Sequence, residues 1–322
     1  MDRISLKASN AISNRPGAAK APAANRETGA AAAAGPPANG DSSSRTDEWF
    51  RLTGPSLTLD PRIHAYRDDI ADIGLAGQVL APHYARPLVR GCGARAATIH
   101  AAPKDDSPAI TELLPGEEFA VLEYAGGWAW GYGRADHVTG YVEAIALAEP
   151  IAATHIVCEK CAPVAPDSRI TSTIIAQLPM GARLHGEECG ACLTTEYGCV
   201  SLAHLRPIGD REPDPVRSAE RLMGAPYRSG GRTLEGIDGP GLIQLALSLA
   251  GLPAPHFADQ QRRLGSEVPD LAPSRRGDLV FGEEGGCGMM IDDLLMIHAS
   301  KAAGKITVAP AASLGTLIRR RF

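Results

Sequence analysis

Hydrophobic and polar residues follow three different patterns along this chain of 322 residues. Residues 1–47 are rich in Ala, Pro, Gly, Asn and Ser and show no apolar periodicity. Such a segment cannot bury enough surface to offset its chain entropy, which predicts a disordered tail. Residues 48–87 predict a helical and extended linker. In it, Asp60-Pro61 opens a short helix that runs to about Leu75, because the carboxylate can cap a helix and proline suits its first position.

The middle of the chain changes to short apolar runs broken by Gly and Pro, which predicts two small all-β modules over residues 88–149 and 150–207. The two modules repeat each other weakly. Each has a Leu-Pro strand, a turn that contains Gly116 or Gly181, a second strand and a closing Gly-Tyr-Val or Gly-Cys-Val.

The last segment, residues 208–322, combines helical and strand patterns. Helical spacing covers Pro215 to Gly224, and a largely apolar helix suited to burial covers Gly241 to Ala250. Three strands are expected over residues 275–281, 287–292 and 294–300. A helix followed by an antiparallel sheet predicts an α+β domain of papain-like order.

The overall composition indicates which partners and which cellular compartment to expect. The net charge of −5 gives no indication of a nucleic-acid or anionic-membrane partner. No apolar run approaches the roughly 18 residues that span a bilayer. The N-terminus lacks the apolar stretch of a secretory signal, so we expect a cytoplasmic protein. The seven cysteines favour thiols or metal ligands over a disulfide framework.

Two motifs in the last segment identify a family. The sequence "MGAPYRSGG" precedes "GIDGPGL", which spans Gly236 to Leu242 and leads into the apolar helix. Together they resemble the NlpC-type (NlpC/p60) cysteine peptidases that cut cell-wall peptides, and the β repeat looks like the bacterial SH3-like barrels that often precede them. The resemblance implies two SH3-like barrels followed by a papain-like α+β domain. It places the family's nucleophilic cysteine at Gly239 and the serine after it at Pro240.

A cysteine peptidase needs a thiolate, a histidine base and a third group that orients the imidazole. The resemblance places the base at Gly286 and the third residue at His298, so two of the three catalytic positions are glycine. Cys287 is next to the lost base, but neighbouring side chains on a strand point to opposite faces, so we expect it in the core. His298 fits a hydrogen-bonded relic better than a catalyst.

The resemblance also implies residues that bind the free amine of a peptide. Asp238 matches the family's aspartate, Glu117 is the counterpart of a barrel glutamate, and Tyr227 is retained. Val138 stands where the family has a barrel tyrosine. Trp128 and Trp130 are candidates for lining a groove, since aromatic side chains supply contact area with a polar edge, although in a small barrel we expect at least one of them in the core.

Two Cys-x-x-Cys pairs lie in the second β module, Cys158 with Cys161 and Cys189 with Cys192. Four thiolates suit a structural zinc ion, although the 27 residues between the pairs exceed the usual spacing. Buried free thiols, and a disulfide or redox pair, are the alternatives. No other cofactor is expected.

These patterns favour an NlpC-type peptidase homologue that has lost hydrolysis and binds a murein-derived peptide or a protein partner. The first alternative is an active endopeptidase that cuts γ-D-Glu-diamino-acid bonds of murein peptides, with Cys287 beside His298 as the substitute nucleophile. The second is an interaction module stabilised by zinc.

Overall fold

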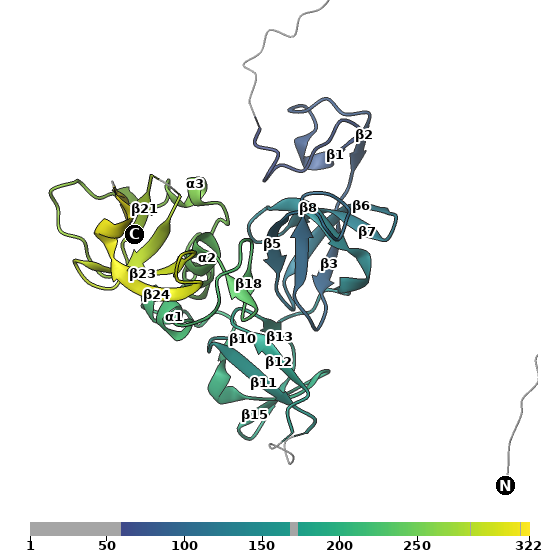
Figure 1. Cartoon of the computed structure of the whole chain (residues 1–322). Coiled ribbons are helices and arrows are strands. Elements are labelled where there is room, and N and C mark those ends of the chain that lie inside the picture. Colours follow the sequence, from purple (N-terminus) through teal and green to yellow (C-terminus); the bar gives the residue numbers. More distant parts are fainter. Residues whose placement is uncertain (1–58, 168–172, 284, 316) are drawn as a thin grey trace, which may run out of the picture. The chain divides into compact units, whose positions relative to one another are not determined.

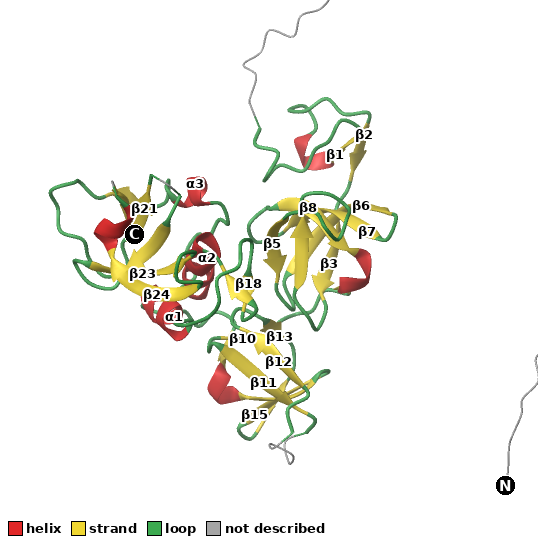
Figure 2. Ribbon diagram, viewed as in Figure 1, coloured by secondary structure: helices red, strands yellow, loops and turns green. Residues whose placement is uncertain are grey.

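The computed structural model describes residues 59–167, 173–283, 285–315 and 317–322, all within the compact unit Ser56–Phe322 (Figure 1). The predicted tail, residues 1–47, lies outside the described residues. Figure 2 shows that strands dominate and helices are few. Among the described residues, no helix is long and apolar enough to cross a membrane.

The predicted helix from Asp60 to Leu75 is wrong. After a turn at residues 61–63, the chain forms strand β1 (Ile70–Asp72), a 3-10 turn η1 (Ile73–Leu75) and strand β2 (His83–Ala85), which runs parallel to β1. The Asp60 carboxylate accepts a hydrogen bond from the backbone N–H of Arg62 at 3.0 Å and also binds its guanidinium. This local contact supports a turn, which competes with a helix cap.

The first β module is a seven-stranded antiparallel sheet in the order β5-β4-β8-β7-β6-β3-β9. The hairpin between β6 and β7 has a two-residue turn, Gly126-Gly127. Both glycines have positive φ, which the favoured two-residue hairpin turns require. Buried Phe119, Val121 and Val142 contribute to its core. The elements are β3 (Leu88–Cys92), β4 (Ala97–His100), β5 (Ala109–Leu113), β6 (Glu118–Ala125), β7 (Trp128–Gly133), β8 (Thr139–Glu143), η2 (Ala144–Ala146) and β9 (Leu147–Ala148).

The second β module has a three-stranded sheet, β13-β10-β17, and a five-stranded sheet, β12-β11-β16-β15-β14. The repeated turns of the two modules lie against each other. Gly116 (φ 74°) and Gly181 (φ 87°) are both left-handed, and the N–H of Arg183 donates to the carbonyl of Pro115 at 2.8 Å. The elements are β10 (His155–Val157), β11 (Cys161–Ala165), β12 (Ala176–Pro179), β13 (Arg183–Leu184), β14 (Glu187–Cys189), β15 (Cys192–Thr195), β16 (Gly198–Ser201), η3 (Leu202–His204) and β17 (Leu205–Pro207).

The C-terminal domain places helix α2 against an antiparallel sheet of order β20-β25-β21-β22-β23-β24. Almost every residue of α2 is buried, as its apolar sequence predicted. The elements are α1 (Pro215–Arg221), β18 (Arg232–Thr233), β19 (Gly236–Ile237), α2 (Gly239–Leu249), α3 (Ala258–Gln261), β20 (Ser266–Glu267), β21 (Leu279–Gly282), β22 (Cys287–Met290), β23 (Leu295–Ser300), β24 (Lys305–Pro310), η4 (Ala311–Leu314) and β25 (Leu317–Arg321).

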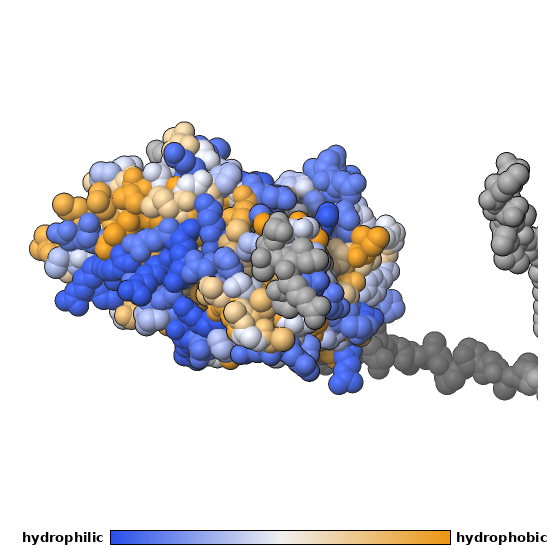
Figure 3. All heavy atoms as spheres, turned by 90° about the horizontal axis from the view of Figure 1, so that it is seen from below, coloured by the Kyte–Doolittle hydropathy of each residue, from blue (hydrophilic) through white to orange (hydrophobic). Residues whose placement is uncertain are grey.

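The core of this domain lies between α2 and one face of the sheet. Leu242, Leu245, Met289 and Ile297 are fully buried there, and each buried side chain of this size stabilises the fold by about 2 kcal/mol. Some large apolar side chains still reach the surface, among them Leu271. Figure 3 shows such apolar groups beside strongly hydrophilic ones on one face of the molecule.

Candidate functional site

The start of α2 is held by Asp238, the residue that caps the helix. Its carboxylate accepts a hydrogen bond from the N–H of Gly241 at 2.8 Å and another from the N–H of Gly230 at 2.7 Å. The first contact satisfies a free N–H of the helix end, and the second ties the preceding glycine loop to it. Asp238 is buried and therefore fixes the geometry of the loop in front of the helix.

Gly239 is the first residue of α2 and faces Cys287 on β22. A Cβ atom at Gly239 would lie 2.6 Å from the Sγ atom of Cys287, which is closer than real Cβ contacts. The Cys287 thiol therefore occupies the space that a side chain at this position would need. Cys287 belongs to the core beneath α2, as strand alternation predicted. Burial raises the pKa of its thiol to about 12, with Asp238 adding to the effect, so the group is not a thiolate at neutral pH.

Gly286 lies directly before β22. A Cβ atom there would lie 2.6 Å from Cδ2 of Leu314, which packs against the core on the other face of the sheet. Neighbouring side chains on a strand point to opposite faces, and Cys287 already points towards Gly239. In this structure, a side chain at Gly286 would not be directed at the helix start. The residue opposite Gly239 is Cys287.

His298 lies on β23 directly opposite Gly288 of β22. This register places His298 on the same face as Gly288, whereas Cys287 shares the other face with Met289 and Ile297. The register speaks against the alternative in which Cys287 and His298 form a nucleophile and base, because the two side chains lie on opposite faces. Burial lowers the pKa of the half-buried His298, which favours a neutral imidazole.

A groove of about 630 Å3 runs past the start of α2 and brings together five of the predicted positions. Burial raises the pKa of Tyr227 in its wall, and Asp238 and Cys287 add to the effect. The groove carries groups of both signs, since Glu283 and Lys301 also line it. The five positions are Tyr227, Asp238, Gly239, Gly286 and His298, and Cys287, the alternative nucleophile, also lines the groove.

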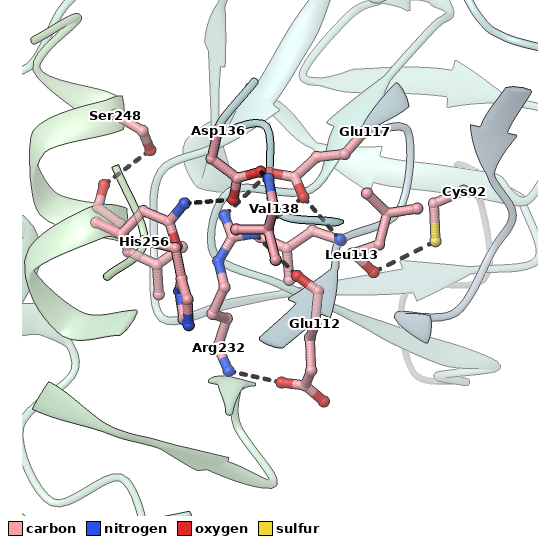
Figure 4. A network of polar contacts seen from close by, with 12 residues as sticks. Cys92, Glu112, Leu113, Glu117, Asp136, Val138, Arg232, Ser248 and His256 are labelled. Carbon is pink, nitrogen blue, oxygen red and sulfur yellow. Dashed lines mark hydrogen bonds and ion pairs between the residues drawn. The ribbon is translucent and has the colours of Figure 1, made fainter. Parts of the chain in front are cut away.

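Glu117 lies outside this groove, in a buried ion pair (Figure 4). Its two carboxylate oxygens accept hydrogen bonds from the guanidinium of Arg232 at 3.0 and 3.1 Å. Burial alone would lower the pKa of Arg232, but Glu117 and Asp136 outweigh it and raise the pKa. The carboxylate that the resemblance assigned to a peptide amine is therefore paired with a cation of the chain itself.

Sequence reasoning missed Glu112, a second carboxylate in the same contact. It accepts from the backbone N–H of Arg232 at 2.6 Å and forms an ion pair with Arg228. Two acids of the first barrel thus bind two arginines of the C-terminal domain. The acids lie in "TELLPGE" and the arginines in "YRSGGR". Only the fold brings these two segments together, so the sequence alone does not indicate the contact.

A polar chain lies beside this ion-pair cluster. The side-chain amide of Gln244 on α2 donates to Asp136 of the barrel at 2.8 Å, and its oxygen lies 3.1 Å from Nδ1 of His256. The other ring nitrogen of His256 contacts the carbonyl of Ile110 at 3.1 Å. Burial lowers the pKa of His256 to about 4. Val138, at the family's tyrosine position, is fully buried and offers no hydroxyl.

The two candidate tryptophans do not line the groove. Trp130 is buried, and the Arg67 guanidinium lies 4.3 Å from its ring centre. Trp128 is partly buried and meets the ring of His100 edge-on at 5.3 Å. Trp130 is thus buried beneath Arg67, while its neighbour Ala129 belongs to the core of the module.

The four cysteines of the Cys-x-x-Cys pairs do not converge on one point. Cys189 and Cys192 oppose each other across the β14–β15 hairpin, while Cys158 donates to the carbonyl of His204 at 3.4 Å. In the described part of the chain, no three His, Cys, Asp or Glu side chains gather as a metal site requires. The residues do not fit the expected zinc site. All seven cysteines, Cys199 and Cys92 included, are free thiols.

Comparison with known proteins identifies two domains. Residues 99–147 match the bacterial dipeptidyl-peptidase SH3 domain, and residues 224–315 match the NlpC/P60 family. The peptidoglycan endopeptidase RipB of Mycobacterium tuberculosis is 34% identical over 116 residues, which are 31% of this chain and 48% of RipB. Dipeptidyl-peptidase 6 of Lysinibacillus sphaericus is 25% identical over 241 residues, which are 66% of this chain and 88% of that protein.

A crystal structure of an NlpC/P60 family protein from Bacillus cereus covers 73% of this chain and 99% of its own, with a TM-score of 0.62. At 17% identity this likeness shows the fold alone. The chain spans about half the length of RipB. These findings confirm the predicted resemblance and the α+β architecture, with an SH3-like domain followed by an NlpC/P60 domain.

Proposed function

We propose that this chain, which carries a bacterial SH3 domain followed by an NlpC/P60 domain, binds a murein-derived peptide in the groove at Gly239 without cutting it. The contact between Gly239 and Cys287 carries the proposal. A glycine begins the helix at which a cysteine peptidase needs its nucleophile, and a buried thiol fills the space in front of it.

The remaining groups of the groove do not supply a substitute pair. Cys287 is buried, its pKa is raised to about 12, and it shares no strand face with His298. Catalytic residues of a triad act as a unit, so the loss of one typically costs several orders of magnitude in rate. This disfavours the active endopeptidase. The zinc-stabilised module loses its support because the four cysteines lie apart.

The groove itself is suited to a peptide. Its size lies in the range of small-molecule sites, roughly 300–1,000 Å3. Lys301 and Glu283 can pair with a carboxylate and an amine, and the Tyr227 hydroxyl adds a neutral partner. The murein peptide is thus our proposed ligand, and a protein segment of similar charge is the alternative. The cytoplasmic location stays a prediction.

The test combines binding and turnover on the purified full chain. Titration calorimetry with the tripeptide L-Ala-γ-D-Glu-diaminopimelate should show saturable binding, and chromatography of the same mixture should show no cleavage. Tyr227→Ala should weaken binding, whereas Lys104→Ala, an exposed cation outside the groove, should leave it unchanged. Accumulating product that disappears after thiol alkylation would refute the loss of hydrolysis, and absence of binding would refute the ligand.

A further inference from the structure

A second cavity, of about 550 Å3, shares no lining residue with the groove at Gly239. Three parts of the chain enclose it: the segment around β1, the turn between β7 and β8, and the loop before α3. We call it the junction cavity. Its apolar walls include Ile63, Leu75 and Pro255. Its size is that of a site for a small organic molecule.

His137 forms part of the wall in an unusual backbone conformation. Its φ of 60° makes it the one non-glycine residue with positive φ in the described ranges. Glycine adopts this conformation freely, whereas in any other residue the Cβ atom makes it sterically unfavourable. The imidazole stacks on the ring of Tyr132, with centroids 5.4 Å apart and planes 11° from parallel. The chain therefore keeps a costly residue in this turn and presents a stacked pair of rings to the cavity.

The polar groups of the cavity are mainly acceptors. Burial raises the pKa of Tyr132 to about 12, and the negative charge of Asp72 adds to the effect. Nδ1 of His64 lies 2.9 Å from the carbonyl of Asp60, so this nitrogen carries a proton. Asp136, whose carboxylate binds Gln244 and the N–H of Val138, is the second acid.

The charge of the cavity selects the ligand. Two carboxylates line it, and no lysine or arginine does among the described residues. Arg134 lies near Tyr132 but is paired with Glu118 at 2.8 Å. Gln260 adds one neutral amide. An anion would meet repulsion here, whereas an ammonium group would find acceptors and, on the stacked rings, a face that attracts cations.

We infer that the junction cavity binds a small aromatic amine, with its ammonium group at Asp72 and Asp136 and its ring against Tyr132 and His137. The inference does not rest on the proposed peptide groove, because the two sites have no residue in common.

Three probes of matched shape test the inference on the full chain by titration calorimetry: 3-phenylpropylamine, 3-phenylpropanol and 3-phenylpropionate. The amine should bind saturably. The alcohol should bind at least about tenfold more weakly, because it lacks the charge that strengthens a hydrogen bond to a carboxylate. The carboxylate should not bind, because the acids of the cavity repel it. Equal binding of the three probes, or no binding of the amine, would overturn the proposal.

Variants locate the site. Asp72→Asn should weaken amine binding about tenfold, while Asp105→Asn, an exposed acid of the β4–β5 loop, should not. His137→Gly relaxes the left-handed backbone, so it should keep or raise the thermal midpoint and still weaken the amine about threefold to tenfold through loss of the ring. Unchanged affinity in His137→Gly overturns the proposal. So does a loss of amine binding in Tyr227→Ala, which would assign the probe to the groove instead.

Discussion

Gly239→Ala is expected to destabilise the C-terminal domain because the new methyl group meets the Cys287 thiol. The Cβ atom would lie 2.6 Å from Sγ, so the thiol or the helix must shift. Overpacking of this kind costs about 1–3 kcal/mol. Replacement of a helical glycine by alanine stabilises a helix by at most about 1 kcal/mol. We therefore expect a net loss of about 1–2 kcal/mol.

Cys287→Ala provides the matched background. It removes Sγ and leaves a small cavity, which costs about 1–2 kcal/mol by itself. In this background Gly239→Ala no longer meets the sulfur and should be neutral or stabilising by up to about 1 kcal/mol. The two substitutions should thus be coupled by about 2 kcal/mol, more than the roughly 0.5 kcal/mol within which independent sites add.

The assay is amide hydrogen exchange of the α2 peptides, measured by mass spectrometry on the full-length wild type, both single variants and the double variant. The exchange rates of α2 report the free energy that opens this domain, without a contribution from the two β modules. Additive effects would show that the thiol does not occupy the space at Gly239. The reasoning on the filled helix start would then be wrong.

Three further outcomes follow from the buried groups. Arg232→Met should lower the free energy of unfolding by about 3–5 kcal/mol, because it leaves Glu117 buried without its ion-pair partner. Urea unfolding, followed by the tryptophan fluorescence of the first barrel, measures this change. Adding Glu117→Leu should recover most of that loss, and an equal loss in the double variant would speak against the ion pair. For His256, the folded pKa of about 4 lies below the unfolded value near 6.5, so the unfolded chain binds more protons between these limits. Stability should therefore fall by about 3 kcal/mol as the pH drops from 6.5 to 4, and a His256→Gln variant that keeps the full slope would contradict this origin. Iodoacetamide should modify exposed Cys189 first and buried Cys287 last, as peptide mass spectrometry can show, and early labelling of Cys287 would contradict its burial.

The sequence predicted the elements that carry their own signals. Helix α2 was expected over Gly241–Ala250 and is observed over Gly239–Leu249, because an apolar run follows the capping residue Asp238. The segment after Asp60 carries a similar start signal but lacks an apolar face behind it. Its carboxylate binds Arg62 instead, and no helix follows. A cap therefore predicts a helix only where burial sustains it.

The site was harder to predict because its geometry depends on pairing between distant segments. Glu117 and Arg232 are separated by 115 positions, and neither residue alone indicates an ion pair. The direction of Cys287 follows from the strand, but only the packing of β22 on α2 shows that this direction ends at Gly239. Several positions that the resemblance named line one groove, but the resemblance could not say which side chain fills the space at Gly239.

The distribution of buried groups is compatible with the proposed loss of hydrolysis, because the fold does not depend on the catalytic positions. The core beneath α2 consists largely of apolar residues such as Leu242 and Met289, and the three positions that the resemblance assigns to catalysis, Gly239, Gly286 and His298, are not among them. The domain is also tied to the first barrel by Arg232, whose buried charge pairs with Glu117. Gly239 adds no side chain to either, and the thiol of Cys287 closes the space beside it. The residues that hold the fold thus differ from the positions assigned to catalysis, so glycine at two of those positions is compatible with the groove that we propose as a binding site.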